Sequence, residues 1–238
     1  MHSSLLLGMT KKKLVVLTGA GISAESGLKT FRDSDGVWEG YRVEDVATPR
    51  AWRRDPALVL EFYNQRRANV AEAMPNAAHK GLAELEADFN VTVITQNIDD
   101  LHERGGSSNV MHLHGEIFKM RSERNESIIA EIRKDILLGD LAPDGAQWRP
   151  HIVWFEEHVP MIEEAMDVVQ AADIFVVIGT SLVVYPAAGL LNYASPAIPK
   201  FIVDKSIPHT SYISNLQVIE KPAVSGIVDL VCALRLLS

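Results

Sequence analysis

The 238 residues of this chain suffice to bury a large hydrophobic core, and 47% of them are hydrophobic, as in an ordinary globular protein. The formal net charge of -8 excludes the basic excess on which general nucleic-acid binding depends. A single cysteine, Cys232, excludes an intrachain disulfide framework, and no stretch approaches the roughly 20 apolar residues that span a bilayer. We therefore expect a cytoplasmic protein that binds neither nucleic acid nor membranes, and we favour a monomer.

Short apolar runs alternate along the chain with longer helical patterns. Strands are expected, in chain order, at residues 14–18, 91–95, 110–113, 174–178 and 201–203. Helical periodicity covers residues 56–73 and 77–88. This alternation predicts an α/β fold, with a Rossmann-like, mostly parallel sheet and helices on both of its faces.

Two regions break this rhythm. Residues 30–54 contain no clean strand, and the chain from residue 117 onward is first polar. A helix is then expected over residues 127–138, where four isoleucines lie roughly on one face, followed by a loop over residues 139–148. We expect a single unit over residues 10–238. Its Rossmann-like part comprises residues 10–29, 77–116 and 151–238, and a small inserted module comprises residues 30–76 and 117–150.

A glycine-rich turn follows the first expected strand. The segment from Gly19 to Ala24, GAGISA, fits the pattern Gly-x-Gly-x-x-Gly/Ala. This pattern predicts a tight turn, backbone N–H groups close to a pyrophosphate, and a helix N-terminus that faces the anion. A tight turn without a ligand is the alternative. A conventional dehydrogenase also needs a strand that ends in an acidic residue about 20 positions on. Glu39 and Glu44 lie near that distance, but neither ends an apolar strand, which disfavours ordinary hydride transfer.

Polar side chains also follow the strand at residues 91–95. Gln96, Asn97 and Asp99 come at its carboxyl end, which is where ligands bind in an open α/β sheet. The alternative is that Asn97 and Asp99 simply cap the next helix.

Two histidines lie in the segment VMHLHGE, residues 110–116. Period-two alternation places His112 and His114 on one face of the strand. A structural role is the favoured interpretation for His112. Gly115 leaves space beside the ring of His114, and an unperturbed pKa of about 6.5 suits a general base at neutral pH.

Together these segments resemble the sirtuins, a family of NAD-dependent protein deacylases. The matching segments are GAGISAESG (19–27), TFRD (30–33), TQNID (95–99), LHGE (113–116) and GTSL (179–182), with weaker matches at RPHIVWF (149–155) and at the strand ending at Asp204. The resemblance extends from about residue 14 to the C-terminus. It implies that residues 31–33 belong to a mobile cofactor loop that takes the place of a second strand.

The resemblance implies NAD as the cofactor and assigns residues to it. Asn97 and Asp99 would bind the nicotinamide carboxamide, and His114 would deprotonate a ribose hydroxyl; these three are the implied catalytic residues. Phe31 would shield the ribosyl carbon from water. The full implied cofactor set is Gly19, Ala20, Gly21, Ile22, Ser23, Glu25, Phe31, Arg32, Gln96, Asn97, Ile98, Asp99, His114, Gly179, Thr180, Ser181, Asp204 and Ala223.

The same resemblance implies that Val153, Trp154 and Phe155 bind the substrate peptide as an added strand. Two departures from the family are visible. Sirtuins commonly carry two Cys-x-x-Cys pairs that hold zinc, but residues 116–150 contain neither cysteine nor histidine, which predicts that no metal is bound. Glu156 stands where the family has glycine. Because glutamate does not readily adopt a positive φ, it either distorts the peptide-binding loop or occupies a tolerant position.

The segments ATPRAW (47–52) and EFYNQRR (61–67) resemble bacterial class III sirtuins, which remove succinyl, malonyl or glutaryl groups. Tyr63 and Arg66 match the Tyr-x-x-Arg signature. On a helix they share a face, and a guanidinium binds a carboxylate in a bidentate manner. Without the family, a core tyrosine and a surface ion pair would be favoured. We expect acidic acyl groups to be removed from acyl-lysine proteins, with release of nicotinamide and 2′-O-acyl-ADP-ribose. The alternatives are a mono-ADP-ribosyltransferase, a deacetylase with a broad acyl range, and a catalytically inactive module that binds acyl-lysine or NAD.

Overall fold

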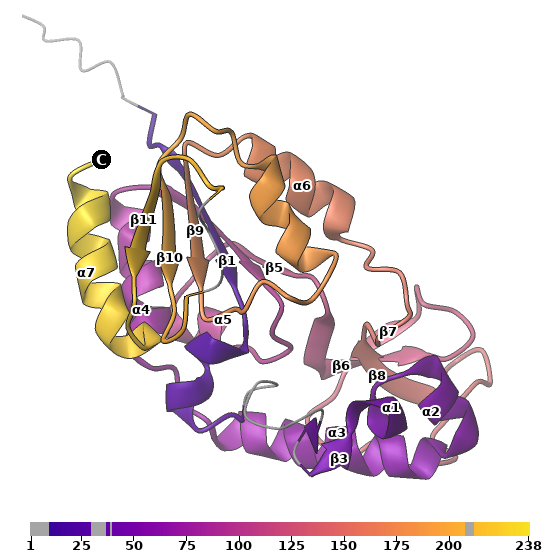
Figure 1. Cartoon of the computed structure of the whole chain (residues 1–238). Helices are drawn as coiled ribbons and strands as arrows, with labels where there is room; N and C mark the ends of the chain where they lie inside the picture. The colour runs from indigo at the N-terminus through magenta and orange to yellow at the C-terminus, as the bar shows by residue number, and fades with distance from the viewer. Residues whose placement is uncertain (1–9, 30–36, 39, 208–211) are drawn as a thin grey trace, which may run out of the picture.

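The computed structural model of the chain describes residues 10–29, 37–38, 40–207 and 212–238. Its centre is a six-stranded sheet in the order β11-β10-β9-β1-β4-β5, and every neighbouring pair is parallel (Figure 1). The strands are β1 (Lys13–Thr18), β4 (Asn90–Thr95), β5 (Val110–His112), β9 (Ile174–Ile178), β10 (Lys200–Val203) and β11 (Leu216–Ile219). All five expected strands are therefore confirmed.

Helices cover both faces of this sheet. On one face, α4 (Ala77–Glu84) and α7 (Ala223–Arg235) pack side by side and bury Leu82 and Ile227 against β1 and β4 (Figure 1). On the other face lie α6 (Ile162–Gln170) and η5 (Ala187–Tyr193), together with a second apolar cluster. Strands buried on both faces are typical of a parallel sheet, so the predicted α/β class and its Rossmann-like layering are confirmed.

A smaller group of elements lies beyond one end of the sheet (Figure 1). It combines α1 (Val43–Val46), α2 (Pro49–Arg54) and α3 (Pro56–Glu72) with a three-stranded antiparallel sheet. The strands of this sheet are β6 (Gly115–Ser122), β7 (Ile129–Glu131) and β8 (Trp148–Ile152), and β2 (Val37–Trp38) pairs separately with β3 (Tyr41–Arg42). One apolar cluster joins the helices to the strands, with Phe62, Ile117 and Ile152 among its members. The boundaries of the two parts stay a prediction.

The prediction of a helix over residues 127–138 is wrong. Residues 129–131 form β7 instead, which pairs with β6 so that Ile129 lies opposite Arg121. Ile132 and Ile136 are buried as expected, but Ile129 is 46% exposed. β-branched residues fit a pleated strand better than a helix, and the ladder with β6 therefore overrides the apparent helical period.

No element was predicted for the polar segment after residue 117, and its first part belongs to β6. The described part of residues 30–54 contains no long strand; it holds α1, α2 and the short strands β2 and β3. No helix within the described ranges is long and apolar enough to cross a membrane.

Candidate active site

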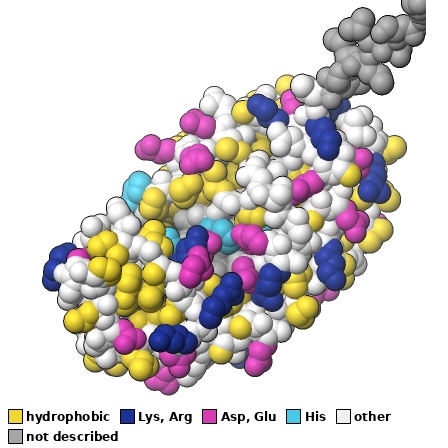
Figure 2. All heavy atoms as spheres, turned by 180° about the vertical axis from the view of Figure 1, so that it is seen from behind, with side chains coloured by type: hydrophobic (Ala, Val, Ile, Leu, Met, Phe, Trp, Pro, Cys, Tyr) yellow, Lys and Arg dark blue, Asp and Glu magenta, His cyan; other side chains and the backbone are white. Residues whose placement is uncertain are grey.

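A cavity of about 330 Å³ opens at the carboxyl ends of the central strands, between the sheet and the smaller group of elements. The order of the sheet changes direction at β1, which has β4 on one side and β9 on the other. A crevice at such a switch point is the usual ligand site of an open parallel sheet. Histidine and charged side chains gather in the middle of the face seen in Figure 2.

Most of the residues expected to bind ligands line this cavity. They are Gly19, Ala20, Gly21, Ser23, Tyr63, Arg66, Gln96, Asn97, Ile98, Asp99, His114, Val153, Trp154, Phe155, Gly179, Thr180, Ser181, Asp204 and Ala223. Ile22 does not line it; its side chain is in the core. Glu25 does not line it either, because its carboxylate accepts a hydrogen bond from Val224 N at the start of α7. Phe31 and Arg32 lie outside the described residues.

The backbone of the glycine turn packs closely against Gly179 and Thr180. A Cβ at Gly19 would lie 2.7 Å from Thr180 Cβ, and one at Gly21 would lie 2.7 Å from Gly179 Cα. The amides of Gly19 and Gly21 already donate to Ile178 O and Gly179 O, at 3.1 and 2.8 Å. The expectation that these two N–H groups face a pyrophosphate is therefore corrected. The helix expected after the turn is replaced by two 3-10 turns, η1 (Ala20–Ile22) and η2 (Ala24–Ser26).

Asn97 and Asp99 meet the glycine turn through Ser23. The Asn97 amide donates to Gly19 O at 3.2 Å and to Ser23 Oγ at 3.1 Å, and Ser23 Oγ donates to Asp99 Oδ2 at 3.1 Å. Asp99 also accepts a hydrogen bond from Leu101 N, so the helix-capping alternative holds for part of its side chain. Burial raises the pKa of Asp99, although these hydrogen bonds oppose the shift.

The ring of His114 is anchored at one nitrogen. His114 Nδ1 lies 3.0 Å from Gln96 O. A carbonyl oxygen only accepts hydrogen bonds, so Nδ1 carries the proton and Nε2 is the nitrogen able to take one up. Burial lowers the pKa of His114, which keeps the ring neutral at pH 7. This is the protonation state that a general base requires.

Tyr63 and Arg66 lie on α3 and reach the cavity together. Both are buried, at 0% and 7% exposure. The Tyr63 hydroxyl makes no hydrogen bond of ordinary geometry with a described residue, and burial raises its pKa. Arg67 faces away from the cavity: its Nε donates to Ile117 O at 2.9 Å and Nη1 donates to Asn64 Oδ1 at 2.7 Å. The pair at positions 63 and 66 therefore presents a phenol and a guanidinium to the same cavity.

Glu156 adopts the conformation that a glycine would favour. Its φ is 73°, and its carboxylate pairs with Arg50 of α2. The loop around it keeps regular contacts, with Val153 N donating to His114 O at 3.0 Å and Phe155 N to Ala47 O at 3.0 Å. The loop thus keeps the positive φ that suits glycine, and Glu156 adopts this conformation at a cost in backbone strain.

Replacing Glu156 by glycine should raise the free energy of unfolding by up to about 1 kcal/mol. Left-handed backbone costs a residue with a Cβ roughly 1–2 kcal/mol, whereas an exposed ion pair contributes about 0–1 kcal/mol. Urea unfolding measures the change. Glu156→Ala is the matched control, because it removes the ion pair and keeps the strain. A glycine variant no more stable than the alanine variant would contradict this explanation.

Two further parts of the cavity wall were not anticipated from the sequence. Glu157 accepts hydrogen bonds from Arg149 Nη1 at 2.8 Å and from Trp154 N at 2.8 Å, and so fixes the loop after β8. The two adjacent glutamates of the segment WFEE were the available clue. Residues 183–186 also line the cavity. No sequence motif identified these residues as part of the site.

Comparisons with known proteins agree with this geometry. A model of the Sir2 family matches residues 19–186. A Helicobacter pylori protein named NAD-dependent protein deacylase is 51% identical over 219 residues, which cover 92% of this chain and 96% of the relative. A Bacteroides thetaiotaomicron protein of the same name is 53% identical over 225 residues, covering 92% and 96%.

Solved structures show the same arrangement. A complex of a Sir2 homologue with NAD superposes with a TM-score of 0.83 at 38% identity, covering 95% of this chain and 91% of that one. A mutant Sir2 homologue in complex with ADP ribose gives a TM-score of 0.85 at 38% identity, covering 95% and 93%.

Proposed function

The chain belongs to the Sir2 family and is an NAD-dependent protein deacylase, and we propose that it removes acidic acyl groups, namely succinyl, malonyl and glutaryl, from protein lysines. The observation that carries this specificity is the placement of Tyr63 and Arg66 in the cavity that His114 also lines. The proposed products are nicotinamide and 2′-O-acyl-ADP-ribose. We further propose that the chain is a bacterial class III sirtuin that acts in the cytoplasm as a monomer.

The residues present fit NAD. Gly19, Gly21 and Gly179 line the cavity and pack so closely that a Cβ added at any of them would clash, and the proposal assigns the phosphates of NAD to the cavity surface beside this backbone. Buried Asn97 and Asp99 provide the polar pair expected at the nicotinamide end. When bound, NAD supplies the ribosyl carbon that takes up the acyl oxygen as nicotinamide leaves. In this proposal His114 Nε2 accepts the proton of a ribose hydroxyl, and Asp204 contacts the adenine ribose.

The acyl group is selected by charge. Arg66 offers two parallel N–H groups to the terminal carboxylate of a succinyl or malonyl chain, and the Tyr63 hydroxyl donates a further hydrogen bond. An acetyl group supplies no carboxylate to either side chain. Hydrogen bonds to charged groups are among the stronger contacts in proteins, so the difference between the two substrates is large.

The peptide around the acyl-lysine lies between two exposed apolar edges. Three residues that line the cavity are exposed and apolar: Phe155 is 41% exposed, and Val183 and Tyr185 are 69% and 72% exposed. An extended peptide pairs with backbone at such edges and places alternate side chains on the two apolar edges. Val153 and Trp154 belong to the same loop as Phe155 and complete this side of the proposed peptide cleft.

We predict that zinc contributes nothing to folding. The strands β6, β7 and β8 are held instead by apolar contacts of Phe118 and Ile132 and by the Ser122 hydroxyl, which donates to Asp144 Oδ2 at 2.7 Å. A strong chelator should leave the melting temperature unchanged, and elemental analysis should find no stoichiometric metal. One zinc per chain, removed by the chelator together with a drop in melting temperature, would overturn this prediction.

Transfer of the acyl group is tested by following both halves of the reaction. A succinyl-lysine peptide is incubated with NAD labelled in the adenosine half, and the peptide and the small molecules are analysed by mass spectrometry. The proposal predicts free lysine on the peptide and the label on a succinylated ADP-ribose. Label attached to protein, with the succinyl group still on the peptide, would support ADP-ribosyl transfer instead.

A further inference from the structure

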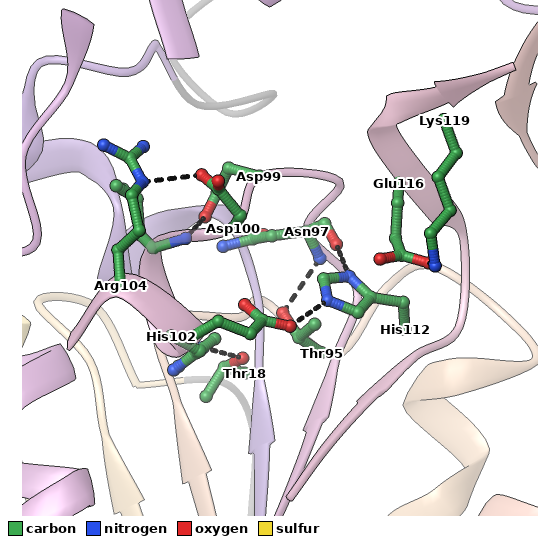
Figure 3. A network of polar contacts seen from close by, with 12 residues as sticks. Thr18, Thr95, Asn97, Asp99, Asp100, His102, Arg104, His112, Glu116 and Lys119 are labelled. Atoms are coloured by element: carbon green, nitrogen blue, oxygen red, sulfur yellow. Dashed lines mark hydrogen bonds and ion pairs between the residues drawn. The ribbon is translucent and has the colours of Figure 1, made fainter. Parts of the chain in front are cut away.

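His112 makes a hydrogen bond through each of its ring nitrogens. Nδ1 lies 3.1 Å from Asn97 O, and Nε2 lies 2.8 Å from Glu103 Oε1. The side chain, on the last residue of β5, is only 9% exposed. Figure 3 shows its ring beside Asn97. A carbonyl and a carboxylate oxygen both accept, so each ring nitrogen has to carry a hydrogen for both bonds to form, and the ring is an imidazolium.

The charges around the ring favour this form. Glu103 faces it from α5 (Leu101–Gly105), Asp99 lies in the preceding turn, and Glu116 and Lys119 face it as an ion pair from β6 (Figure 3). His102 also lies nearby, but burial lowers its pKa so far that it stays neutral. Burial alone would lower the pKa of His112. The hydrogen bond and charge of Glu103, together with the charge of Glu116 and the hydrogen bond to Asn97 O, raise it.

The carbonyl that His112 binds belongs to the turn that carries Asn97 and Asp99. Three successive carbonyls of this turn accept hydrogen bonds from residues 112–117, which run from the end of β5 into β6. His114 Nδ1 donates to Gln96 O, His112 Nδ1 to Asn97 O, and Ile117 N to Ile98 O at 2.8 Å. Two of these three bonds come from histidine side chains. The turn that directs the Asn97 and Asp99 side chains toward Ser23 is therefore held in part by His112, a residue that does not line the cavity.

We infer that His112 is a positioning residue, an imidazolium clamp between Glu103 and the Asn97 carbonyl that holds the turn of residues 96–99 in the shape needed to bind the nicotinamide end of NAD. This inference rests on the proposed roles of Asn97 and Asp99. Because the pKa of His112 is raised, both bonds form at and below the ordinary histidine pKa of about 6.5. As the pH rises through the higher value in the folded protein, the ring keeps one hydrogen. The Glu103 carboxylate, the stronger acceptor, holds that hydrogen at Nε2, and the bond from Nδ1 to Asn97 O is lost. In this proposal His112 acts as a protonated imidazolium, whereas His114 acts as a neutral imidazole.

Two isosteric variants separate the two bonds. In His112→Asn the amide nitrogen takes the place of Nδ1, so the bond to Asn97 O is kept and no longer titrates. In His112→Gln the amide takes the place of Nε2, so the contact with Glu103 is kept and the bond to Asn97 O is lost. We expect KM for NAD to rise about tenfold in His112→Gln at pH 7, with kcat changed less, and to stay near the wild-type value in His112→Asn.

The pH profile gives the decisive comparison. In the wild type, KM for NAD should increase on the alkaline side, and this increase should be absent in His112→Asn. Glu103→Gln, which removes the carboxylate partner, should move the increase to lower pH. These profiles are measured with whichever acyl peptide is turned over best, so a wrong acyl assignment leaves the test intact. An alkaline increase that persists unchanged in His112→Asn would overturn the inference.

A second readout does not depend on activity. Titration of the His112 ring by NMR, in the enzyme without NAD, should give a pKa above about 6.5 in the wild type and a lower value in Glu103→Gln. A wild-type value at or below 6.5 would also overturn the inference. If no acyl peptide is turned over, calorimetric titration of NAD into wild type, His112→Asn and His112→Gln replaces KM, with the same expected order of affinities.

Discussion

Replacement of His114 by alanine is expected to lower the rate of acyl removal by about 10²–10⁴-fold, the usual contribution of a general base, while NAD still binds. The ring is anchored through Nδ1 to Gln96 O, which leaves Nε2 as the basic atom. Because Asn97, Asp99 and the glycine turn remain in place, binding should largely survive. Single-turnover kinetics measures the first quantity, and calorimetric titration with NAD measures the second.

His114→Asn is the matched control for this prediction. Its amide nitrogen can still donate to Gln96 O and hold the turn, but the side chain cannot accept a proton as imidazole does. Loss of activity in both variants therefore identifies the basic nitrogen as the missing group. An asparagine variant that retains most of its turnover would remove His114 from the role of base.

The same assignment gives the acidic side of the pH profile. Burial lowers the pKa of His114, so the neutral ring persists below the ordinary value of about 6.5 and is lost only as the pH falls through the lower value in the folded protein. The rate should accordingly hold down to pH values below 6.5 and then decline.

Replacement of Arg66 by methionine is expected to reduce removal of a succinyl group by about 10²-fold. Two hydrogen bonds to a charged group are lost, each contributing roughly 1.5–3 kcal/mol, and about 1.4 kcal/mol corresponds to a factor of ten in kcat/KM. Removal of an acetyl group should stay similar or improve, because acetyl makes no use of the guanidinium. Both values are obtained from steady-state assays on one peptide sequence that carries either acyl group.

Two neighbouring side chains provide controls for Arg66. Tyr63→Phe removes a single hydroxyl and should show the same preference change more mildly. Arg67→Met alters a guanidinium that bonds to Ile117 O and Asn64, outside the cavity, and whose burial lowers its pKa to about 10. This substitution should lower the free energy of unfolding and change kcat/KM for the succinyl and the acetyl substrate by a similar factor. If Arg66→Met also lowers both activities equally, Arg66 is structural and the acidic-acyl proposal fails.

The central strands could be predicted because their apolar runs are long enough to be buried on both faces. β1 and β9, which read LVVLT and IFVVI over their buried residues, are examples. β11 was missed because it lies at the edge of the sheet, where Gln217 and Val218 are exposed and Leu216 and Ile219 are only partly buried. β6 was missed because its charged residues Glu116, Lys119 and Arg121 resemble those of a loop, although every residue of the strand is buried or partly buried.

The site was predictable where a motif lies directly at the end of a strand. Asn97, Asp99, His114 and Thr180 are such cases, since parallel strands bring their carboxyl ends together. The hydrogen bonds among these residues were not predictable. Gly21 N donates to Gly179 O because of how β1 and β9 lie in register, and Glu103 meets His112 because α5 folds back across the end of β5. Such contacts depend on tertiary geometry that no local pattern contains.

Acyl selectivity tests the account most directly. The measurement is the ratio of kcat/KM for succinyl-lysine to that for acetyl-lysine, in one peptide sequence and at saturating NAD. Placement of Tyr63 and Arg66 in the cavity beside His114 predicts a ratio of at least about ten in favour of succinyl. A ratio at or below one would contradict it.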